Sequence, residues 1–412
     1  MDVLQATCVI SGGGPAGMML GLLLARNGVD VVVIEKHADF FRDFRGDTIH
    51  PSTLGVLGEL GLRERFLGLP HTNVRTLDAV VSGTRLHPVD FSRLAPPDDF
   101  LVLAPQWDFL SFLADEAAER PGFRLLMETT ATGLTWRDGA VTGITARGPA
   151  GDLAIAAPLV VAADGRDSVL REDAGLRPQR FGVPIDVLWF RLPKAAATPP
   201  STLAYLRHGS MVITIDRGDY FQTGLVIAKG GIDDLNAAGI GAFRDAVAAA
   251  APFLRDALLS IDGWEQVKLL SVQIDRLARW YRRGFLAIGD AAHAMSPAFG
   301  VGVNYAVQDA VAAANALVDP LRAIQGGASE EVDLRVLDGL QRRRLPPVAA
   351  MQRIQLAAHR GIARPNGPGA LPDPLPLLVR GALAAATPLL QRATARFIGR
   401  GLRPESVRPG LR

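Results

Sequence analysis

The sequence predicts an α/β protein in which a parallel-sheet domain carries an inserted, mostly antiparallel β-sheet domain and is followed by C-terminal helices. Three observations lead to this fold class. The first forty residues read strand, glycine turn, helix, strand; residues 181–271 hold short β-rich runs; and the chain after residue 321 is rich in alanine, leucine and arginine. With 412 residues, the chain is also too long for a single ordinary core.

The composition is that of a soluble globular protein, with 48% hydrophobic and 21% charged residues. A single cysteine, Cys8, excludes a disulfide framework and a cysteine-ligated zinc or iron–sulfur site, and we expect no bound metal. The longest apolar run, 154–163, is well short of the ~20 residues of a membrane span. The N-terminus lacks the basic flank of a signal peptide, so we expect a cytoplasmic protein.

The net charge of +2 conceals a basic tail. Residues 341–412 contain 13 arginines and two acids, which gives this segment +11 and leaves −9 on the remainder. Such a tail could contact nucleic acid or a membrane, but we expect it to dock on the acidic body as a helical cap. We therefore predict no nucleic-acid partner and disfavour membrane contact. The apolar residues that recur at three- and four-residue steps, and that should form the docking face, are Val379, Leu383, Ala386, Leu390, Ala393 and Phe397.

The N-terminal strand–turn–helix has the spacing of a dinucleotide-binding fingerprint. A strand at 7–11 leads into Gly12-Gly13-Gly14-Pro15-Ala16-Gly17, a helix follows to about residue 27, and a second strand ends at Glu35. Gly12 permits a tight turn, Gly14 lets the backbone approach a pyrophosphate, and Gly17 allows close helix–strand packing. Glu35 lies where a carboxylate can accept from a ribose hydroxyl. The alternative is a glycine-rich turn in an unrelated α/β domain.

Two further apolar strands end in an acid. The first, 159–163, leads into Asp164, and the second, 285–288, leads into Gly289-Asp290. The carboxyl ends of parallel strands are where ligands bind in open α/β sheets, although either aspartate could simply cap a helix. A glycine loop at 297–302 then opens a helix that we expect from about Asn304 to Val318.

The remaining segments define the expected organisation. We predict strands at 185–192, 201–206, 211–215, 220–227 and 267–274, one helix at about 240–259, and a C-terminal helical region broken by its prolines. The resulting division is a discontinuous first domain of residues 1–75, 101–180 and 272–325, a β-sheet domain of residues 76–100 and 181–271, and a helical segment of residues 326–412.

These motifs resemble those of the single-component FAD-dependent aromatic hydroxylases, the p-hydroxybenzoate hydroxylase-like flavoprotein monooxygenases that include ubiquinone-biosynthesis hydroxylases. The resemblance covers residues 5 to about 320 and implies a Rossmann-like FAD-binding domain with an inserted substrate-binding β-sheet domain. It rests on three motifs in the family's order: Gly12 to Gly17 with Glu35; Ala163-Asp164-Gly165 with Ser168 and Arg171; and Gly289 to His293 through Pro297, Gly300, Gly302 and Asn304.

The resemblance also implies residue roles. Glu35 would hold the adenosine ribose, Asp290 the ribityl chain, and Arg45 the pyrophosphate or adenosine. We expect loss of Asp290 to weaken FAD binding more than loss of Glu35, because Glu35 should lie at the more exposed adenosine end. The full set of implied FAD-binding residues is Gly12, Gly14, Pro15, Ala16, Gly17, Glu35, Lys36, Arg45, Gln106, Ala131, Asp164, Gly289, Asp290, Pro297, Gly300, Gly302, Val303 and Asn304.

The implied reaction is hydroxylation of an aromatic or phenolic small molecule. NADH or NADPH would reduce a non-covalent FAD, and O2 would then form a flavin C4a-hydroperoxide that transfers oxygen to the ring. The N–H groups of the glycine loop 297–302 would stabilise charge on the reduced flavin. An apolar lid should exclude water, and strand alternation lets only about half of its members face the flavin. Our lid candidates are Leu188, Trp189, Phe190, Tyr205, Tyr220 and Phe221.

The same fold also supports other activities. A halogenase of the related class would carry a W-x-W-x-I-P segment, which this sequence lacks. An isoprenoid-reductase-like FAD-dependent reductase or dehydrogenase has similar motifs and stays open, as does a non-catalytic FAD-holding scaffold. As the catalytic base we name His50 and Tyr220 as candidates, each of which could instead be structural. We expect a monomer or a homodimer.

Overall fold

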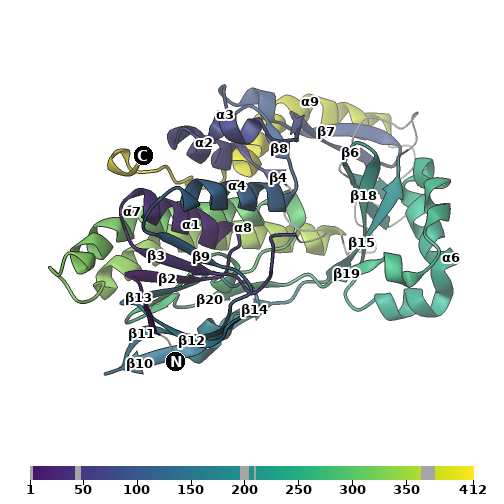
Figure 1. Ribbon diagram of the computed structural model, residues 1–412. Helices are drawn as coiled ribbons and strands as arrows, with labels where there is room; N and C mark the ends of the chain where they lie inside the picture. Colours follow the sequence, from purple (N-terminus) through teal and green to yellow (C-terminus); the bar gives the residue numbers. More distant parts are fainter. Residues whose placement is uncertain (1–2, 42–47, 195–203, 208–209, 363–375) are drawn as a thin grey trace.

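A six-stranded, mainly parallel sheet forms the centre of the protein (Figure 1). The computed structural model describes residues 3–41, 48–194, 204–207, 210–362 and 376–412. The strands lie in the order β21-β22-β13-β2-β3-β9, and all run parallel to their neighbours except β21. Their bounds are β2 Cys8–Ser11, β3 Val31–Ile34, β9 Phe123–Leu126, β13 Leu159–Ala162, β21 Tyr281–Arg282 and β22 Phe285–Ala287.

Two different layers cover the faces of this central sheet. Helices α1, α4 and α7 lie along one face, and the four-stranded sheet β1-β12-β11-β10 lies along the other (Figure 1). Strands β2, β3 and β13 are therefore buried on both faces, which explains why they read as continuous apolar runs. The bounds of the covering elements are α1 Pro15–Arg26, α4 Gln106–Ala118, α7 Gly302–Gln325, β1 Val3–Gln5, β10 Thr130–Arg137, β11 Ala140–Gly148 and β12 Gly151–Ala156.

A seven-stranded sheet forms the second large layer, and helix α6 covers its outer face (Figure 1). It combines residues 76–90 with residues 185–270 in the order β19-β15-β18-β17-β16-β6-β7, and it is antiparallel except between β16 and β6. Its elements are β6 Thr76–Val81, β7 Thr84–Asp90, β15 Ile185–Pro193, β16 Ala204–Arg207, β17 Ser210–Asp216, β18 Tyr220–Ala228, α6 Ile232–Ala250 and β19 Lys268–Leu270.

Strand alternation divides the six lid candidates between the two faces of this sheet. Trp189 packs with Val187 on the face away from α6, and Tyr220 precedes Phe221 on β18 and so points away from it. The expectation that only part of the set can face inward is thus confirmed. The four candidates that pack in the core beneath α6 are Leu188, Phe190, Tyr205 and Phe221.

The predicted strand at 267–274 is wrong, because the structure divides it into β19 and β20 (Ile274–Leu277), which belong to different sheets. Between the two strands, side chains replace a neighbouring strand as the hydrogen-bond partners of the backbone. The Asp186 carboxylate accepts from the Val272 N–H at 3.0 Å, and the Lys229 ammonium donates to the Val272 carbonyl at 2.9 Å. The peptide groups at this point therefore have partners other than a neighbouring strand.

Two helix predictions also need correction. The helix expected at 240–259 is part of α6 (Ile232–Ala250), whose helical backbone is broken at Gly239 (φ +85°), directly before the predicted start, and which ends before Pro252. The predicted break at Pro346 and Pro347 is wrong, because α8 runs unbroken from Leu334 to Ile362. Pro347 and Val348 are buried along this helix, so tertiary packing outweighs the local preference of proline.

The C-terminal region docks on the body, but through a different helix face from the one predicted. Gln391 of α9 (Leu377–Ala395) donates to the His87 carbonyl on β7 at 2.9 Å, and Ala395 packs against Phe91 and Leu94. Leu390, by contrast, is 49% exposed. Polar contacts to β7 therefore select the docked face, which the apolar pattern alone could not predict. Ala386 and Ala393 are likewise exposed, and the side chains of Val379 and Leu383 lie outside the described part of the chain. Phe397, the last residue of the predicted face, is partly buried and does pack against the body.

The last twelve residues are held by buried charge. The Glu405 carboxylate is fully buried; it accepts from the Arg343 Nε at 2.7 Å and lies 3.5 Å from the Arg344 guanidinium. Arg344 in turn binds Asp309 of α7 at 2.8 Å. The pairs of Glu405 thus lie within the basic segment itself, and the predicted contact with the acidic body is made by Arg344 to Asp309, Arg408 to Asp319 and Arg412 to Glu59. In the part of the chain that the structure describes, no helix is both long and apolar enough to cross a membrane.

The other described elements are short. They are β4 Thr48–Ile49, α2 Pro51–Glu59, α3 Arg63–Leu67, β5 Thr72–Val74, β8 Leu101–Leu103, α5 Val169–Asp173, β14 Pro178–Phe181 and the π-helical turn η8 Arg396–Arg400.

We predict that Glu405→Gln lowers the free energy of unfolding by ~1–3 kcal/mol, because buried arginine groups lose a charged acceptor. Urea unfolding followed by circular dichroism measures this change. Asp152→Asn is the matched control, because the Arg147–Asp152 pair is exposed (71% and 53% for the two side chains) and should not move the midpoint. Equal midpoints for wild type and Glu405→Gln would contradict the role of Glu405.

Candidate active site

The glycine turn between β2 and α1 places backbone without side chains at the end of the central sheet. Gly12 has φ +109°, and a Cβ there would lie 2.4 Å from the Ala163 carbonyl oxygen. A Cβ on Gly17 would lie 1.9 Å from the Gly12 oxygen, so the helix can pack this closely only with glycine. A Cβ on Gly14 would meet nothing within 4 Å. The N-terminus of α1 therefore opens onto free space, as an anion-binding helix end requires.

Glu35 closes the turn from the neighbouring strand. It follows β3 directly and is 8% exposed, and its Oε2 accepts from the Gly13 N–H at 2.9 Å while its Oε1 accepts from the His37 N–H at 3.1 Å. Glu35 therefore shapes the glycine turn itself. Our expectation that Glu35 is more exposed than Asp290 is wrong, because the Asp290 side chain is 36% exposed and that of Glu35 is 10% exposed.

Asp164 follows β13 and lies against the same turn, since a Cβ on Gly12 would approach its Cα to 2.8 Å. Burial raises the pKa of the Asp164 carboxyl above its usual range, while hydrogen bonding to Ser168 opposes that rise. Its Oδ1 is buried and has no hydrogen-bond partner among the described residues. An unsatisfied buried oxygen beside an open glycine turn suits a ligand that supplies a hydrogen-bond donor.

Asp290 and Arg166 form a pair at the ends of two neighbouring strands. The Arg166 Nε lies 3.2 Å from the Asp290 Oδ2, and Arg166 also donates to the Met295 carbonyl at 3.3 Å. Gly289 has φ +58°, and a Cβ there would meet the Ala16 Cβ at 3.1 Å. The third motif therefore packs directly on the first turn of α1, and both motifs border one site.

The glycine loop at 297–302 is held in an unusual backbone conformation before α7. Phe299 and Gly300 both have positive φ, +68° and +62°, and a Cβ on Gly300 would clash with the Thr48 Oγ1 at 2.4 Å. The Asn304 amide fixes this loop from inside: it donates to the Gly300 carbonyl at 3.3 Å and accepts from the His50 N–H at 2.9 Å. Gly302 starts α7 with open space around it.

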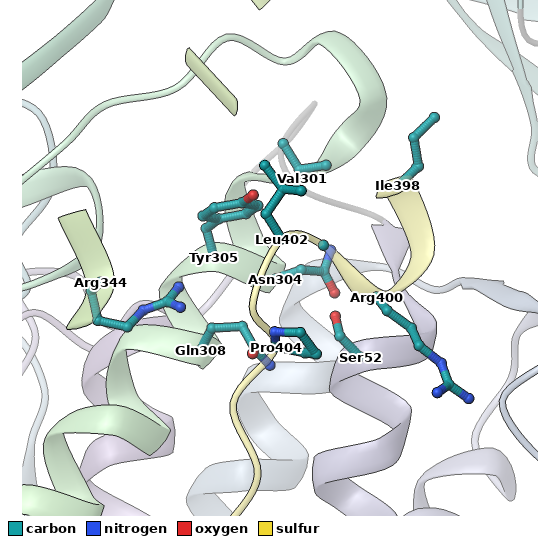
Figure 2. Close-up of a pocket in the computed structure, with 11 residues that line it drawn as sticks. Ser52, Val301, Asn304, Tyr305, Gln308, Arg344, Ile398, Arg400, Leu402 and Pro404 are labelled. Carbon is teal, nitrogen blue, oxygen red and sulfur yellow. The ribbon is translucent and has the colours of Figure 1, made fainter. Parts of the chain in front are cut away.

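Figure 2 shows the interior side of this loop, where Asn304, Gln308 and Tyr305 of α7 meet the chain segment around Leu402. The cavity here is about 10 Å³, room for a single water molecule. This cavity is too small for a substrate.

Comparison with known proteins identifies the family to which this chain belongs. The model of the FAD binding domain family matches residues 5–353. The chain belongs to this family. It is 32% identical over 360 residues to the 6-methylpretetramide 4-monooxygenase of Streptomyces rimosus, a match that covers 86% of this chain and 83% of the relative.

Two solved structures share the fold. The anhydrotetracycline hydroxylase OxyS of Streptomyces rimosus superposes with a TM-score of 0.73 at 21% identity, over 96% of this chain and 76% of that one. PqsL of Pseudomonas aeruginosa superposes with a TM-score of 0.72 at 21% identity, over 89% and 98% of the two chains. The predicted family and fold class, an FAD-dependent monooxygenase with a Rossmann-like domain and an inserted β-sheet domain, are confirmed.

The residues present fit FAD. The bare glycine turn can receive a pyrophosphate, the free Asp164 oxygen and the half-exposed Asp290 can accept from sugar hydroxyls, and Pro15 and Ala16 begin α1 at the same point. Gln106 is buried at the start of α4, and Ala131 is buried on β10 beside a bulge in the pairing with β11. Pro297 and Val303 flank the glycine loop, Lys36 is exposed after Glu35, and Arg45 lies outside the described residues.

The two candidate bases have different surroundings. His50 is fully buried, its Nδ1 donates to the Ile398 carbonyl at 2.8 Å, and burial lowers its pKa to about 4. This ring is built into the contact between α2 and the C-terminal turn η8. Tyr220 is half-buried on β18, with the Arg191 guanidinium 5.0 Å from the centre of its ring. Of the two, only Tyr220 lies on the inner face of the seven-stranded sheet, which is the face away from α6.

Sequence reasoning missed Asp309, which supports the third motif from α7. Its Oδ2 accepts from the Gly289 N–H at 3.0 Å and lies 2.5 Å from the His293 Nε2, and its Oδ1 accepts from Arg344. Burial would raise the pKa of Asp309, but His293 and Arg344 lower it to about 2. The signal was a lone acid in the apolar run 305–314. His293, which belongs to the third motif, is a buried partner of this acid.

We predict that Glu35→Gln weakens FAD binding about tenfold or more, since the amide cannot accept from both backbone N–H groups and one is left unsatisfied. Fluorescence titration of the apoprotein with FAD measures the dissociation constant. Glu128→Gln makes the same chemical change at an exposed site and should bind FAD as the wild type does. A wild-type constant for Glu35→Gln would show that the turn holds its shape without this carboxylate.

We also predict that stability falls as the pH is lowered from about 6.5 to about 4. His50 and His359 both have pKa values of about 4, lowered by burial from 6.5, so the unfolded chain binds protons first in this range. His50→Asn keeps a donor for Ile398 and should flatten part of the fall in melting temperature. His71→Asn, at a half-buried surface histidine, should leave it unchanged. A fall as steep in His50→Asn as in the wild type would contradict this assignment.

Proposed function

We propose that this FAD-dependent monooxygenase hydroxylates a flat, oxygen-bearing aromatic molecule, with NADH or NADPH as reductant and O2 as co-substrate. The observation that carries the proposal is the composition of the inner face of the seven-stranded sheet, which combines an apolar floor with a polar end. The 6-methylpretetramide 4-monooxygenase, the curated relative described above, supports a fused-ring substrate in particular.

The apolar floor centres on Trp189. It packs with Val187 and Ile213, and Gly224 on the adjacent strand leaves space for the indole: a Cβ there would come within 3.1 Å of the ring. A flat, apolar surface of this kind suits the face of an aromatic ring.

The polar end lies farther along the same strands. Gln222 pairs across the sheet with Arg191, and the Arg217 guanidinium donates to the Gln222 Oε1 at 3.0 Å. Tyr220 stands beside Arg191 on this face. These groups can donate to phenolic or carbonyl oxygens of a substrate and so set which ring position approaches the cofactor.

Bound FAD supplies the chemistry of electron transfer from the nicotinamide and of oxygen delivery to the ring. The chain's own residues supply position and environment. Gly302 begins α7 with open space and free N–H groups, which favour negative charge at that point. Trp189 and its neighbours exclude water from the reacting ring. Tyr220 is our candidate for proton transfer at a substrate hydroxyl, and His50 remains a weaker one because its Nδ1 is bound to Ile398.

The wider assignments follow from this function. We assign cofactor binding to residues 1–75, 101–180 and 272–325 and substrate binding to residues 76–100 and 181–271. We place the enzyme in the cytoplasm, where NAD(P)H is available, as a monomer or homodimer that needs neither nucleic acid nor a membrane. The alternative activity, an isoprenoid-reductase-like reduction, would need no apolar ring site with a polar end.

The deciding experiment is turnover with NAD(P)H under ¹⁸O2 against a panel of phenols, quinolones and fused-ring polyphenols. We expect NAD(P)H oxidation stimulated by a fused-ring aromatic and one ¹⁸O atom in the product, found by mass spectrometry. A product that gains two hydrogens and no ¹⁸O would instead establish a reductase. Tyr220→Phe should lower kcat while leaving the FAD dissociation constant unchanged; an unaltered kcat would remove Tyr220 from the mechanism.

A further inference from the structure

Helix α8 presents a buried polar face to the loop that precedes the cofactor-facing glycines. Gln352, Gln355 and His359 recur at three- and four-residue steps and are 1%, 0% and 2% exposed. Buried amides and imidazoles are retained only where they have hydrogen-bond partners, so the partners of this face show what it does.

Gln355 binds the backbone of this loop at three points. Its Oε1 accepts from the Ser296 N–H at 3.2 Å, and its Nε2 donates to the Ser296 and Ala298 carbonyls at 3.1 and 3.0 Å. Gln352 extends the pattern by donating to the Ala294 carbonyl at 2.9 Å. Without Gln355, the Ser296 N–H and carbonyl would lose these partners, whereas the Ala294 carbonyl also accepts from the Asp275 N–H at 3.2 Å.

His359 also binds this loop, but through a loop side chain and not through the backbone. Its Nε2 lies 2.7 Å from the Ser296 Oγ, and that oxygen accepts from the Ala298 N–H at 3.1 Å. Ser296 can therefore donate its proton to His359 while it accepts from the backbone. Helix α8 thus binds the loop at Ala294, Ser296 and Ala298, while Arg166 binds the Met295 carbonyl between them.

This loop leads directly into the strained turn at Phe299 and Gly300. A non-glycine residue at positive φ persists only where its surroundings over-determine the conformation. Gln355 and His359 supply such a constraint immediately upstream. They also lie beyond residue 353, where the match to the family model ends. On the same helix turn, Leu356 packs with Trp189 on the inner face of the seven-stranded sheet.

We infer that Gln355 and His359 are positioning residues, which fix the loop at 294–300 so that the glycines before α7 meet the flavin in one conformation. Their contacts with the loop are independent of any substrate. The inference rests on the proposed function only in that this loop faces the FAD. Leu356 places the same helix turn against the substrate face, so α8 is shared by both halves of the active site.

The test compares hydrogen-bonding and apolar side chains of similar size at these two positions. Gln355→Leu and His359→Leu remove the polar contacts, His359→Gln restores an acceptor near the Nε2 position, and Ile354→Ala alters an exposed residue (40%) on the same helix. The FAD dissociation constant of each apoprotein, the visible absorption bands of the bound flavin and its reduction potential are measured, with far-UV circular dichroism as a check on folding.

We expect both leucine variants to bind FAD about tenfold more weakly or worse, with shifted flavin bands and potential. His359→Gln and Ile354→Ala should stay close to the wild type. A wild-type dissociation constant, spectrum and potential in the leucine variants, with only the melting temperature lowered, would overturn the proposal. Equal damage in His359→Gln or in Ile354→Ala would also overturn it, because the effect would then follow helix packing.

If Gln355→Leu does not fold, the two His359 variants decide the result by themselves. The titration uses no substrate, so its outcome is separate from the ¹⁸O2 experiment. A protein that hydroxylates no aromatic could still show the expected loss of FAD affinity, and a working hydroxylase could still show none.

Discussion

The arrangement of the active site depends on the hydrogen bond and ion pairs that one buried carboxylate, that of Asp309, makes. It binds the Gly289 N–H, His293 and Arg344, and Arg344 in turn meets Glu405 of the C-terminal tail. Two buried carboxylates that face arginines, together with a buried histidine, are stable only if each charge keeps its partner. The turn that carries Asp290 is therefore held by residues from α7, α8 and the tail together.

This dependence explains which parts of the site the sequence could predict. Gly12, Gly17 and Gly289 are dictated by local backbone geometry, because a Cβ on Gly12 or Gly17 would collide with a backbone oxygen and Gly289 has φ +58°. Positions under such constraints require glycine, so they can be recognised in the sequence. Strands β2, β3 and β13 were predictable for a similar reason, since burial on both faces requires a continuous apolar run.

The parts that could not be predicted depend on long-range partners. The strand at 267–274 divides because Asp186 and Lys229, more than forty residues earlier in the sequence, bind the backbone at Val272. The docked face of α9 is set by Gln391 and its bond to β7, and it leaves the apolar Leu390 outside. In both cases polar contacts to backbone groups from distant parts of the chain override a hydrophobic pattern, because a buried peptide group left unsatisfied costs ~1–3 kcal/mol.

The two halves of the active site are consequently specified in different ways. The cofactor half is fixed by motifs whose backbone geometry is nearly independent of side-chain choice, as the glycine turn and its Glu35 contact show. In the substrate half that we propose, the face of the strand decides the surroundings of each residue, so that the adjacent Leu188 and Trp189 pack in different clusters. We therefore expect substitutions on the inner face to change the substrate without disturbing FAD. Substitutions in α8 reach both halves, because Gln355 contacts the loop and Leu356 contacts the substrate face. Helix α8 is thus the element through which changes at one half can alter the other.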